Sequence, residues 1–478
     1  MLQDTGLGQE MFVSVYNKKQ EDGVEKTMCH RYTDDLVDVE TDQENAIPNE
    51  QLSERSIVYC VSPPGETQWV KNASYSSSDA TEALNGTTIQ DSSSSTKSTI
   101  QQKYPLVDEE HVSAIIKFYG DSDSLLTSTN LGGAEMATMD GHELFDSHLA
   151  QFKDTPVLHA ITCKNVQGTM GVPFFTNTQL DDTLSQARDI RGPLIDYIAT
   201  YFGGDKLVSE FVLLQLLSKV SIERHGLKIG QFCLNISNFN SDSSAQSIKN
   251  LVSSLVLHQV SIPLTLETLN KSRFSPQSVN EDLLSGVLQL VPGTHVIVDE
   301  SELSEGQLGD TGVRNMQALI NAIQHQKLTY GFPYSQFDFD VDLGFITLST
   351  RKSLLPNQCT IAVKPAYPMD QSQEDNRSLP TKQQLDVFRM FLQVLRNASY
   401  EIPESISQYI QDDFVKERKQ ASEQQMPLPS QDDLMLRMNL CRLVALSFGE
   451  QTLTKDTYDY AVQLDQLRKS RNLEMTTP

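Results

Sequence analysis

Between residues 207 and 350 the sequence alternates between segments with the apolar pattern of helices and segments with that of strands. This alternation restricts the fold more than any other feature. LVSEFVLLQLLSKV (207–220) is apolar almost all round, which predicts a buried helix. Alternating strands and helices are typical of an α/β layer with a largely parallel sheet, so we place an α/β core at residues 180–365. The periodicity predicts strands at 229–236, 262–269, 294–300 and 343–350 and helices at 247–258, 282–290 and 313–326.

The segment before this core is rich in strand patterns. Short β-branched and aromatic runs predict one β-domain at residues 1–165, similar to an OB barrel because that fold consists of about five such strands. A Ser/Thr-rich stretch at about 73–105 interrupts the domain, and its low apolar content predicts disorder. Residues 121–148 have no clear period and are expected to form a loop. The strands are expected at 11–16, 57–61, 112–119 and 156–163.

Helical patterns follow the core after a linker at about 365–380 that is rich in proline and acidic residues. We place a C-terminal helical lid at residues 380–472. Thr381 and Gln384 have the spacing of a capping box, which predicts that the first lid helix begins there. The remaining expectations are a helix at 403–420, a helix at 434–448 ended by Gly449, a last helix begun by Thr454, and a frayed end at which the basic run 467–471 is solvated.

The formal net charge of −25 argues against several classes of function. A chain this acidic repels phosphate backbones, so we expect no sequence-specific binding of nucleic acid. The six cysteines lie far apart without a CxxC pair, which argues against a zinc site and fits a reducing compartment. No run approaches the roughly 18 apolar residues of a membrane span, and the first residues do not resemble a signal peptide. We therefore expect a soluble, intracellular chain that binds neither a metal nor a membrane.

The sharpest local motif is THVIVDE (294–300), an apolar strand that ends in Asp299 and Glu300. It is similar to the Walker B motif of AAA+ ATPases, in which the first acid holds Mg²⁺ and the second orients the attacking water. A nucleotide also requires the loop GxxxxGK[ST], whose backbone N–H groups cradle the phosphates. The segment SNFNSDSSAQSIK after Ile236 contains no glycine, its lysine is Lys249, and no GK dipeptide occurs in the chain. We therefore expect both acids to be vestigial, with no catalytic residue and no cofactor.

Longer segments carry a family resemblance. They resemble the mini-chromosome maintenance (MCM) complex-binding protein family in VSEFVLLQLLSKV (208–220), LQLVPGTHVIVDESELSEGQLGDTGVRNMQALINAIQHQKLTYGF (288–332) and TLTKDTYDYAVQLDQLRKSR (452–471). The resemblance implies a degenerate AAA+ core, related to the MCM helicase subunits, between an OB-like domain and a helical lid. It also implies a nuclear protein that binds MCM subunits in place of one of them and reaches chromatin through them. Roles in MCM assembly or unloading, DNA replication, cell division and sister-chromatid cohesion go with the family.

Together these observations indicate a non-enzymatic binding protein whose core presents the surface of a helicase subunit without holding a nucleotide. Three alternatives stay open. The first is an ATPase with an atypical phosphate loop, supported only by the two acids of the THVIVDE strand. The second is a nucleic-acid-binding module in which Tyr16, Tyr59 and Trp69 stack on bases, although Asp34 and neighbouring acids flank them. The third is an acidic chaperone or adaptor for basic nuclear proteins.

Overall fold

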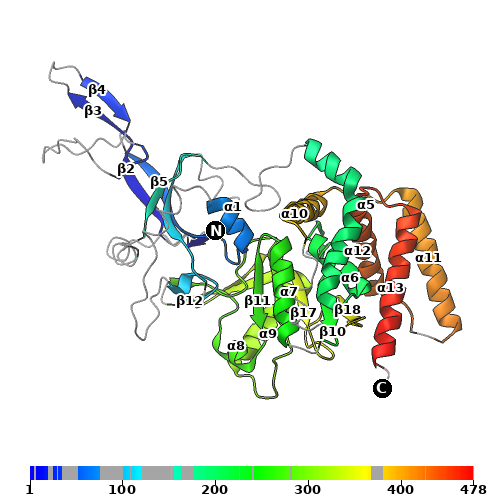
Figure 1. The fold of residues 1–478 in the computed structure, drawn as a ribbon. Coiled ribbons are helices and arrows are strands. Elements are labelled where there is room, and N and C mark those ends of the chain that lie inside the picture. The colour runs from blue at the N-terminus through cyan, green and yellow to red at the C-terminus, as the bar shows by residue number, and fades with distance from the viewer. Residues whose placement is uncertain are drawn as a thin grey trace. The chain divides into compact units, whose positions relative to one another are not determined.

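The computed structural model divides the chain into two compact units (Figure 1). Unit 1 comprises residues 1–64, 87–166 and 276–286, and unit 2 comprises residues 65–86, 167–275 and 287–478. Our predictions of disorder at 76–100 and of a loop at 121–148, and most of the predicted linker, lie outside the described residues. The structure describes residues 1–4, 7–19, 25–29, 31–34, 52–75, 101–107, 109–120, 152, 155–162, 177–224, 227–239, 242–279, 282–367, 380–425 and 427–476.

Unit 1 contains a five-stranded sheet made of β1 (Leu2–Asp4), β2 (Gln9–Val13), β5 (Leu52–Val61), β6 (Ser113–Tyr119) and β7 (Val157–His159). β5 pairs antiparallel with β1, β2 and β6, and β6 pairs parallel with β7. The predicted strands before and after the Ser/Thr-rich stretch therefore lie in one sheet. The unit also contains two antiparallel hairpins, β3 (Val15–Lys19) with β4 (Glu25–Cys29) and β12 (Gln277–Val279) with β13 (Asp282–Leu284).

The end of the predicted disordered stretch is part of the packed structure of unit 1. Residues Gln101–Lys103 form the short 3₁₀ helix η2, and Tyr104 after it is buried. The Lys103 ammonium is fully buried because it pairs with the carboxylates of Asp4 and Asp282, the latter at 3.1 Å. The disorder predicted at about 73–105 is therefore wrong for residues 101–105, and it is also wrong for residues 73–75, which belong to helix α1 (Gln68–Tyr75). Two acidic partners that are distant in sequence stabilise a lysine in a segment with little apolar content.

Unit 2 contains a sheet of five parallel strands, which confirms the predicted α/β core. The strand order is β11 (Gln259–Pro263), β14 (His295–Asp299), β17 (Gly344–Leu348), β10 (Leu234–Ser237) and β18 (Cys359–Ala362). β14 is the strand predicted from THVIVDE, and it lies inside the sheet with every residue buried. A strand that is buried on both faces reads as a continuous apolar run, which is why its sequence predicted it well.

Helices pack against this parallel sheet and share one hydrophobic core with it. Phe211, Ile248 and Phe391, from three different helices, are completely buried there. The helices of unit 2 are α1 (Gln68–Tyr75), α5 (Asn177–Ala199), α6 (Lys206–Leu217), α7 (Asp242–Leu255), α8 (Leu266–Lys271), α9 (Asp310–His325), α10 (Lys382–Asn397), α11 (Glu404–Glu423), α12 (Gln431–Ser447) and α13 (Lys455–Thr476), and the 3₁₀ turn η4 (Thr200–Phe202) follows α5. Two hairpins complete the unit, β8 (Ile222–Arg224) with β9 (Leu227–Ile229) and β15 (Lys327–Gly331) with β16 (Gln336–Asp340).

The strand predicted at 229–236 is wrong in its first half, because residues 230–233 are not in a strand and β10 begins only at Leu234. Two further predicted elements differ from the structure. The segment 282–290 is not helical, because Leu283 pairs with Ser278 in the β12–β13 hairpin and Gly286 interrupts the apolar run. The predicted strand at 262–269 ends at Pro263, and its second half belongs to helix α8. Thr265 begins that helix by accepting a hydrogen bond from the backbone N–H of Thr268 at 3.0 Å. Both segments are short, and short apolar runs do not separate strand from helix by periodicity alone.

The predicted C-terminal helices are confirmed, and so are their boundary signals. Thr381 and Gln384 form a capping box at the start of α10. Gly449 follows α12 with φ at +77°, a left-handed conformation that glycine adopts without strain. Thr454 accepts a hydrogen bond from Thr457 N–H at the start of α13, as predicted. None of the described helices combines the length and the apolar character that a membrane crossing requires.

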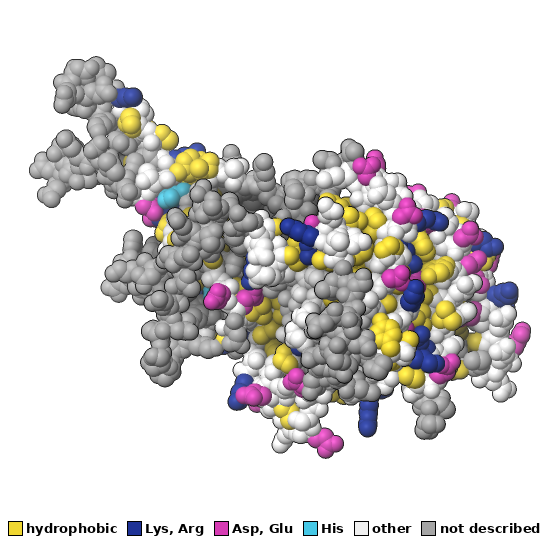
Figure 2. Space-filling view, in the orientation of Figure 1, with side chains coloured by type: hydrophobic (Ala, Val, Ile, Leu, Met, Phe, Trp, Pro, Cys, Tyr) yellow, Lys and Arg dark blue, Asp and Glu magenta, His cyan; other side chains and the backbone are white. Residues whose placement is uncertain are grey.

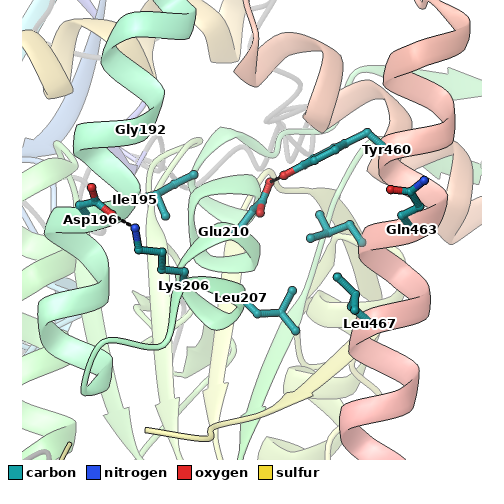
Figure 3. Close-up of a pocket in the computed structure, with 10 residues that line it drawn as sticks. Gly192, Ile195, Asp196, Lys206, Leu207, Glu210, Tyr460, Gln463 and Leu467 are labelled. Carbon is teal, nitrogen blue, oxygen red and sulfur yellow. Dashed lines mark hydrogen bonds and ion pairs between the residues drawn. The ribbon is translucent and has the colours of Figure 1, made fainter. Parts of the chain in front are cut away.

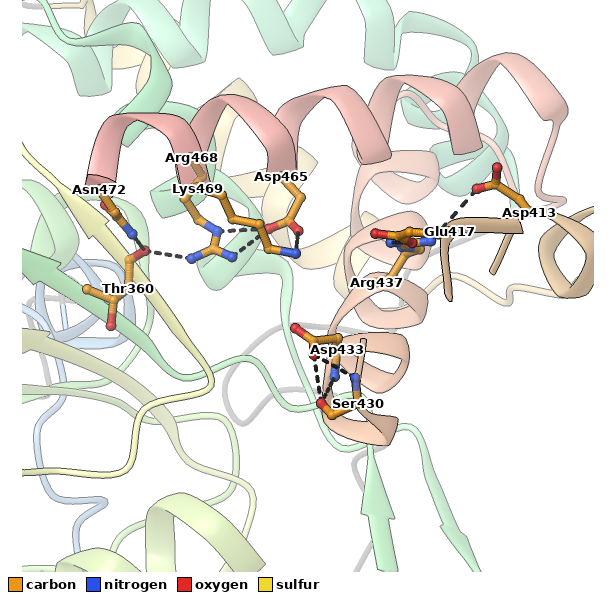
Figure 4. A network of polar contacts seen from close by, with 10 residues as sticks. All are labelled: Thr360, Asp413, Glu417, Ser430, Asp433, Arg437, Asp465, Arg468, Lys469 and Asn472. Carbon is orange, nitrogen blue, oxygen red and sulfur yellow. Dashed lines mark hydrogen bonds and ion pairs between the residues drawn. The ribbon is translucent and has the colours of Figure 1, made fainter. Parts of the chain in front are cut away.

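The end of α13 is fixed to the sheet, so the prediction of a frayed, solvated terminus is wrong. Arg468 donates to the carbonyl of Thr360 on edge strand β18 at 2.9 Å, and Asn472 donates to the same oxygen at 2.7 Å (Figure 4). The Asn472 side-chain oxygen also accepts from Ala362 N–H at 2.9 Å. These side chains satisfy backbone groups of a sheet edge that has no further strand, which protects the edge from pairing with another chain.

Candidate functional site

The carboxyl edge of the parallel sheet is the place where the sequence predicted vestigial chemistry. All five strands run in the same direction, so their carboxyl ends meet at one edge. Asp299 lies beside Leu348 of β17, and Leu348 lies beside Ile236 of β10. The polar loop after β10 and the acids after β14 are thus separated by the width of one strand. Open α/β sheets bind ligands at this edge, so the question is whether its residues fit a nucleotide.

Asp299 is buried, and both of its carboxylate oxygens face groups of the same chain. Oδ1 accepts hydrogen bonds from the backbone N–H of Ser301 at 3.1 Å and from its hydroxyl at 2.5 Å. Oδ2 lies 3.9 Å from the ammonium nitrogen of Lys249 on helix α7. A fixed ammonium group therefore stands beside the carboxylate that would hold Mg²⁺ in a Walker B motif. That Lys249 and Asp299 are neighbours could not be predicted from the sequence.

Glu300 is also engaged within the chain. It accepts hydrogen bonds from the hydroxyl of Ser353 at 2.9 Å and from the backbone N–H of Leu354 at 3.2 Å. Burial raises the pKa of Glu300, although these hydrogen bonds oppose the increase. Ser353 in turn accepts a hydrogen bond from Asn357, so Glu300 holds the loop between β17 and β18 in place. A residue used in this way is not positioned to orient a water molecule.

The loop after β10 uses its backbone and side-chain donors inside the fold. Phe239 is completely buried, and its N–H donates to the carbonyl of Ser349 at 3.1 Å. The side chain of Asn238 donates to the carbonyl of Val363 at 3.1 Å. A phosphate cradle requires successive backbone N–H groups that point outward at the start of the helix. In the described part of this loop, the backbone N–H of Phe239 and the side chain of Asn238 thus have partners inside the fold.

These contacts do not fit a Mg²⁺-nucleotide complex. The described residues contain no group of three or more His, Cys, Asp and Glu side chains that could hold a metal ion. Asp299 has Lys249 and Ser301 as neighbours, and Glu300 has Ser353 and Leu354. In the described part of the edge, both acids thus have partners within the chain and a structural use.

The aromatic residues considered for base stacking are not arranged as a platform. Tyr59 is completely buried in the core of unit 1. Trp69 belongs to unit 2, where its Nε1–H donates to the carbonyl of Val256 at 3.1 Å and the Arg389 guanidinium lies 4.1 Å from the ring centre. The side chain of Tyr16 lies outside the described residues. Stacking on bases requires exposed ring faces, so Tyr59 does not support the nucleic-acid-binding alternative.

Unit 1 contains an ionic cluster that the sequence does not indicate. Arg55 is buried, donates to Glu10 at 2.9 Å and pairs with Asp34, and Lys117 contacts the same two carboxylates at 3.0 and 2.8 Å. Burial alone would raise the pKa of Glu10 and of Asp34, but hydrogen bonds from the two cations outweigh it and lower both. Two cations balance two carboxylates, so this cluster is a structural network. The negative charge of Asp34, one of the acids that flank the aromatic residues in the sequence, is balanced there by Arg55 and Lys117.

Two exposed apolar features of unit 2 are better candidates for contact with a partner. The first is the β15–β16 hairpin, where Tyr334 is fully exposed and the rings of Phe332 and Phe337 pack edge to face, 5.7 Å apart. The second is a groove between α5, α6 and α13 with a volume of about 410 Å³, defined here as the α5–α6–α13 groove (Figure 3). Figure 2 shows hydrophobic side chains among charges of both signs on the surface of this helical part. Exposed apolar patches with polar rims mark interaction sites.

Comparisons with known proteins place the chain among related sequences. The family model described as "Mini-chromosome maintenance replisome factor" matches residues 1–99 and 76–472. The chain is 30% identical to the mini-chromosome maintenance complex-binding protein of Gallus gallus, over 77% of this chain and 61% of that protein. It is 32% identical to the protein of the same name from Salmo salar, over 60% of this chain and 46% of that protein. It is 27% identical to the mini-chromosome maintenance complex-binding protein of Danio rerio, over 98% of this chain and 87% of that protein. The first two alignments thus span less than two thirds of the relatives.

Proposed function

The chain belongs to the family of mini-chromosome maintenance (MCM) replisome factors, and from this premise we propose that it is a non-catalytic binding protein of the MCM complex. Its relatives carry the name MCM complex-binding protein. In this proposal the core of unit 2 is a degenerate AAA+ domain, the C-terminal helices are its lid, and the sheet of unit 1 is an OB-like domain. The three parts correspond to residues 180–365, 380–472 and 1–165.

The observation that carries the proposal is that Asp299 and Glu300, at the carboxyl edge of the parallel sheet, are both engaged by groups of the same chain. The sheet retains an acidic strand, β14, in an interior position, and a helix follows the strand β10 as in a nucleotide-binding domain. The Lys249 ammonium nevertheless faces Asp299, and Glu300 is bound to the loop at Ser353. The arrangement supports a protein that has the shape of an ATPase subunit and holds no nucleotide.

The mechanism that we propose is mimicry of a helicase subunit. Neighbouring subunits of AAA+ rings meet across their nucleotide sites, so a partner without such a site occupies the position without supporting hydrolysis there. The chain thereby holds MCM subunits in an inactive form during assembly or unloading. On this proposal it is a nuclear protein that reaches chromatin through MCM and serves DNA replication and sister-chromatid cohesion. The exposed aromatic hairpin and the α5–α6–α13 groove offer surfaces for such contacts.

The decisive experiment is reconstitution with purified MCM subunits. The full chain should form a stable complex with one or more subunits, and the complex should persist at a salt concentration that screens simple charge attraction. Binding that follows the charge of the partner and disappears with salt would favour an acidic chaperone instead. No binding to any MCM subunit would refute the proposal.

A parallel measurement separates this proposal from the ATPase alternative. The chain and its Asp299→Asn variant should show the same response to Mg·ATP in calorimetric titration, because neither has a phosphate cradle. Tight binding of Mg·ATP by the wild type that is lost in Asp299→Asn would instead identify an atypical ATPase.

A further inference from the structure

The α5–α6–α13 groove has an apolar floor and one polar group at its base. Leu207, Leu464 and Leu467 line it from α6 and α13, and Leu467 is 59% exposed although it is aliphatic. On the rim, Asp196 and Lys206 form an exposed ion pair at 2.8 Å. The volume of about 410 Å³ is in the range of ligand sites, which run from roughly 300 to 1,000 Å³. Figure 3 shows that the groove is bordered along its length by two helices.

The polar group at the base is the carboxylate of Glu210, which is only 8% exposed. Its Oε1 accepts hydrogen bonds from Arg191 and from the hydroxyl of Tyr460, the latter at 2.7 Å. No side chain in the described part of the chain donates to Oε2, and Figure 3 shows this oxygen directed toward the space beside Leu207. A carboxylate oxygen in an apolar surrounding attracts a hydrogen-bond donor, and most strongly a charged one.

The wall of the groove is open at Gly192 of α5. A Cβ atom added there would meet nothing within 4 Å. Gly192 precedes Pro193 inside α5, and a residue that carries a Cβ atom is disfavoured in helical backbone before proline, so glycine suits this position. Here it leaves the groove wide enough for an incoming side chain, since the next turn of α5 presents Ile195 and Asp196 to the same space.

We propose that this groove is the docking site for a basic and aliphatic segment of the MCM partner, an inference that rests on the proposed function. One aliphatic side chain of the segment fills the space between Gly192 and Leu467. A lysine or arginine one turn away reaches Oε2 of Glu210. Asp196 pairs with Lys206 and Glu210 with Arg191, so what supports a cationic partner is the open Oε2 of Glu210 together with the net charge of −25 on the whole chain. An amphipathic helix in a groove between helices is a common mode of peptide recognition.

The test fills the groove at Gly192. Gly192→Leu places an aliphatic side chain in the open space. Gly192→Ala is the matched control, because it puts the same Cβ atom before Pro193 and leaves the groove open. The full-length variants are titrated with purified MCM subunits. We expect Gly192→Leu to weaken binding at least tenfold and Gly192→Ala to stay within twofold of the wild type. Equal thermal unfolding midpoints of the two variants show that both are folded.

A photo-crosslinking residue gives a second, independent readout. It is placed at Leu467 in the groove and, as a control, at Val415 on α11, which has a similar exposure of 50%. We expect a crosslink to an MCM subunit from position 467 only. Two results would overturn the docking site and leave the proposed function intact. One is that Gly192→Leu binds MCM subunits as tightly as the wild type does. The other is equal crosslinking from positions 467 and 415. No binding by the wild type would overturn both.

Discussion

Substitution of Lys249 by methionine tests whether this residue has replaced a metal ion beside Asp299. The ammonium nitrogen lies 3.9 Å from Oδ2 of Asp299, and the carboxylate is 2% exposed, whereas the lysine side chain is 21% exposed. Methionine keeps the length of the side chain and removes its charge. The buried carboxylate then retains its two hydrogen bonds from Ser301 but loses its cation.

The expected loss of stability lies between two limits. Two unit charges about 4 Å apart attract each other by roughly 4 kcal/mol at the effective dielectric constant near a protein surface and by roughly 1 kcal/mol in water. Breaking a buried pair costs about 3–5 kcal/mol and breaking an exposed pair about 0–1 kcal/mol. Lys249 retains some contact with water, so we expect Lys249→Met to lower the free energy of unfolding by about 2 kcal/mol. Asp299→Asn in the same chain should restore most of it, because the amide oxygen still accepts from Ser301.

The assay uses the single tryptophan of the chain. Trp69 packs on Val256 and Arg389 within unit 2, so its fluorescence in urea reports the unfolding of that unit. The reasoning would be refuted if Lys249→Met were as stable as the wild type. It would also be refuted if Mg²⁺ alone stabilised Lys249→Met while Asp299→Asn abolished the effect, since the site would then be a metal site that the lysine merely covers.

Three further predictions use the same fluorescence assay. Gly192→Ala should raise the free energy of unfolding by less than the roughly 0.5–1 kcal/mol by which alanine usually exceeds glycine inside a helix, because its Cβ atom directly precedes Pro193; the full gain would contradict this. Thr381→Ala should lower it by about 1 kcal/mol, whereas Thr381→Ser should keep the capping box of α10. Burial lowers the pKa of His258 to about 4, below its value of about 6.5 in the unfolded chain. His258 should therefore contribute a loss of up to roughly 1.4 kcal/mol per pH unit in unit 2 as the pH falls from about 6.5 to 4, and His258→Gln should remove that contribution.

The sequence predicted the elements whose signals are local. The buried strand β14, the helix α9 and the capping box at Thr381 were all identified from periodicity or cap chemistry. These signals depend on neighbours within a few residues, so they can be recognised from the sequence without knowledge of the fold. The same is true of the left-handed Gly449 after α12, where only backbone freedom matters.

The sequence could not predict contacts made by charged side chains across the fold. The basic run at the end of α13 looked solvated, yet Arg471 makes two hydrogen bonds of 2.7 Å to the carboxylate of Asp205. Asp205 also begins helix α6, where it accepts from Val208 N–H at 3.3 Å. A run of charged residues is predicted to be solvated when its partners lie hundreds of residues away, because no nearby residue in the sequence indicates them. The α5–α6–α13 groove was missed for the same reason, because its walls come from three separate helices.

The structural contacts of Asp299 and Glu300 explain why two acids persist at a sheet edge that does not fit a nucleotide. Asp299 forms a turn at the end of β14 by accepting from Ser301 N–H, a local use that any strand end can have. Glu300 fixes the loop at Ser353, which shapes the surface beyond β17. If that surface contacts an MCM subunit, the acids are retained for the shape of the interface. Glu300→Gln should then weaken MCM binding while leaving the response to Mg·ATP unchanged, whereas an ATPase would show both effects together.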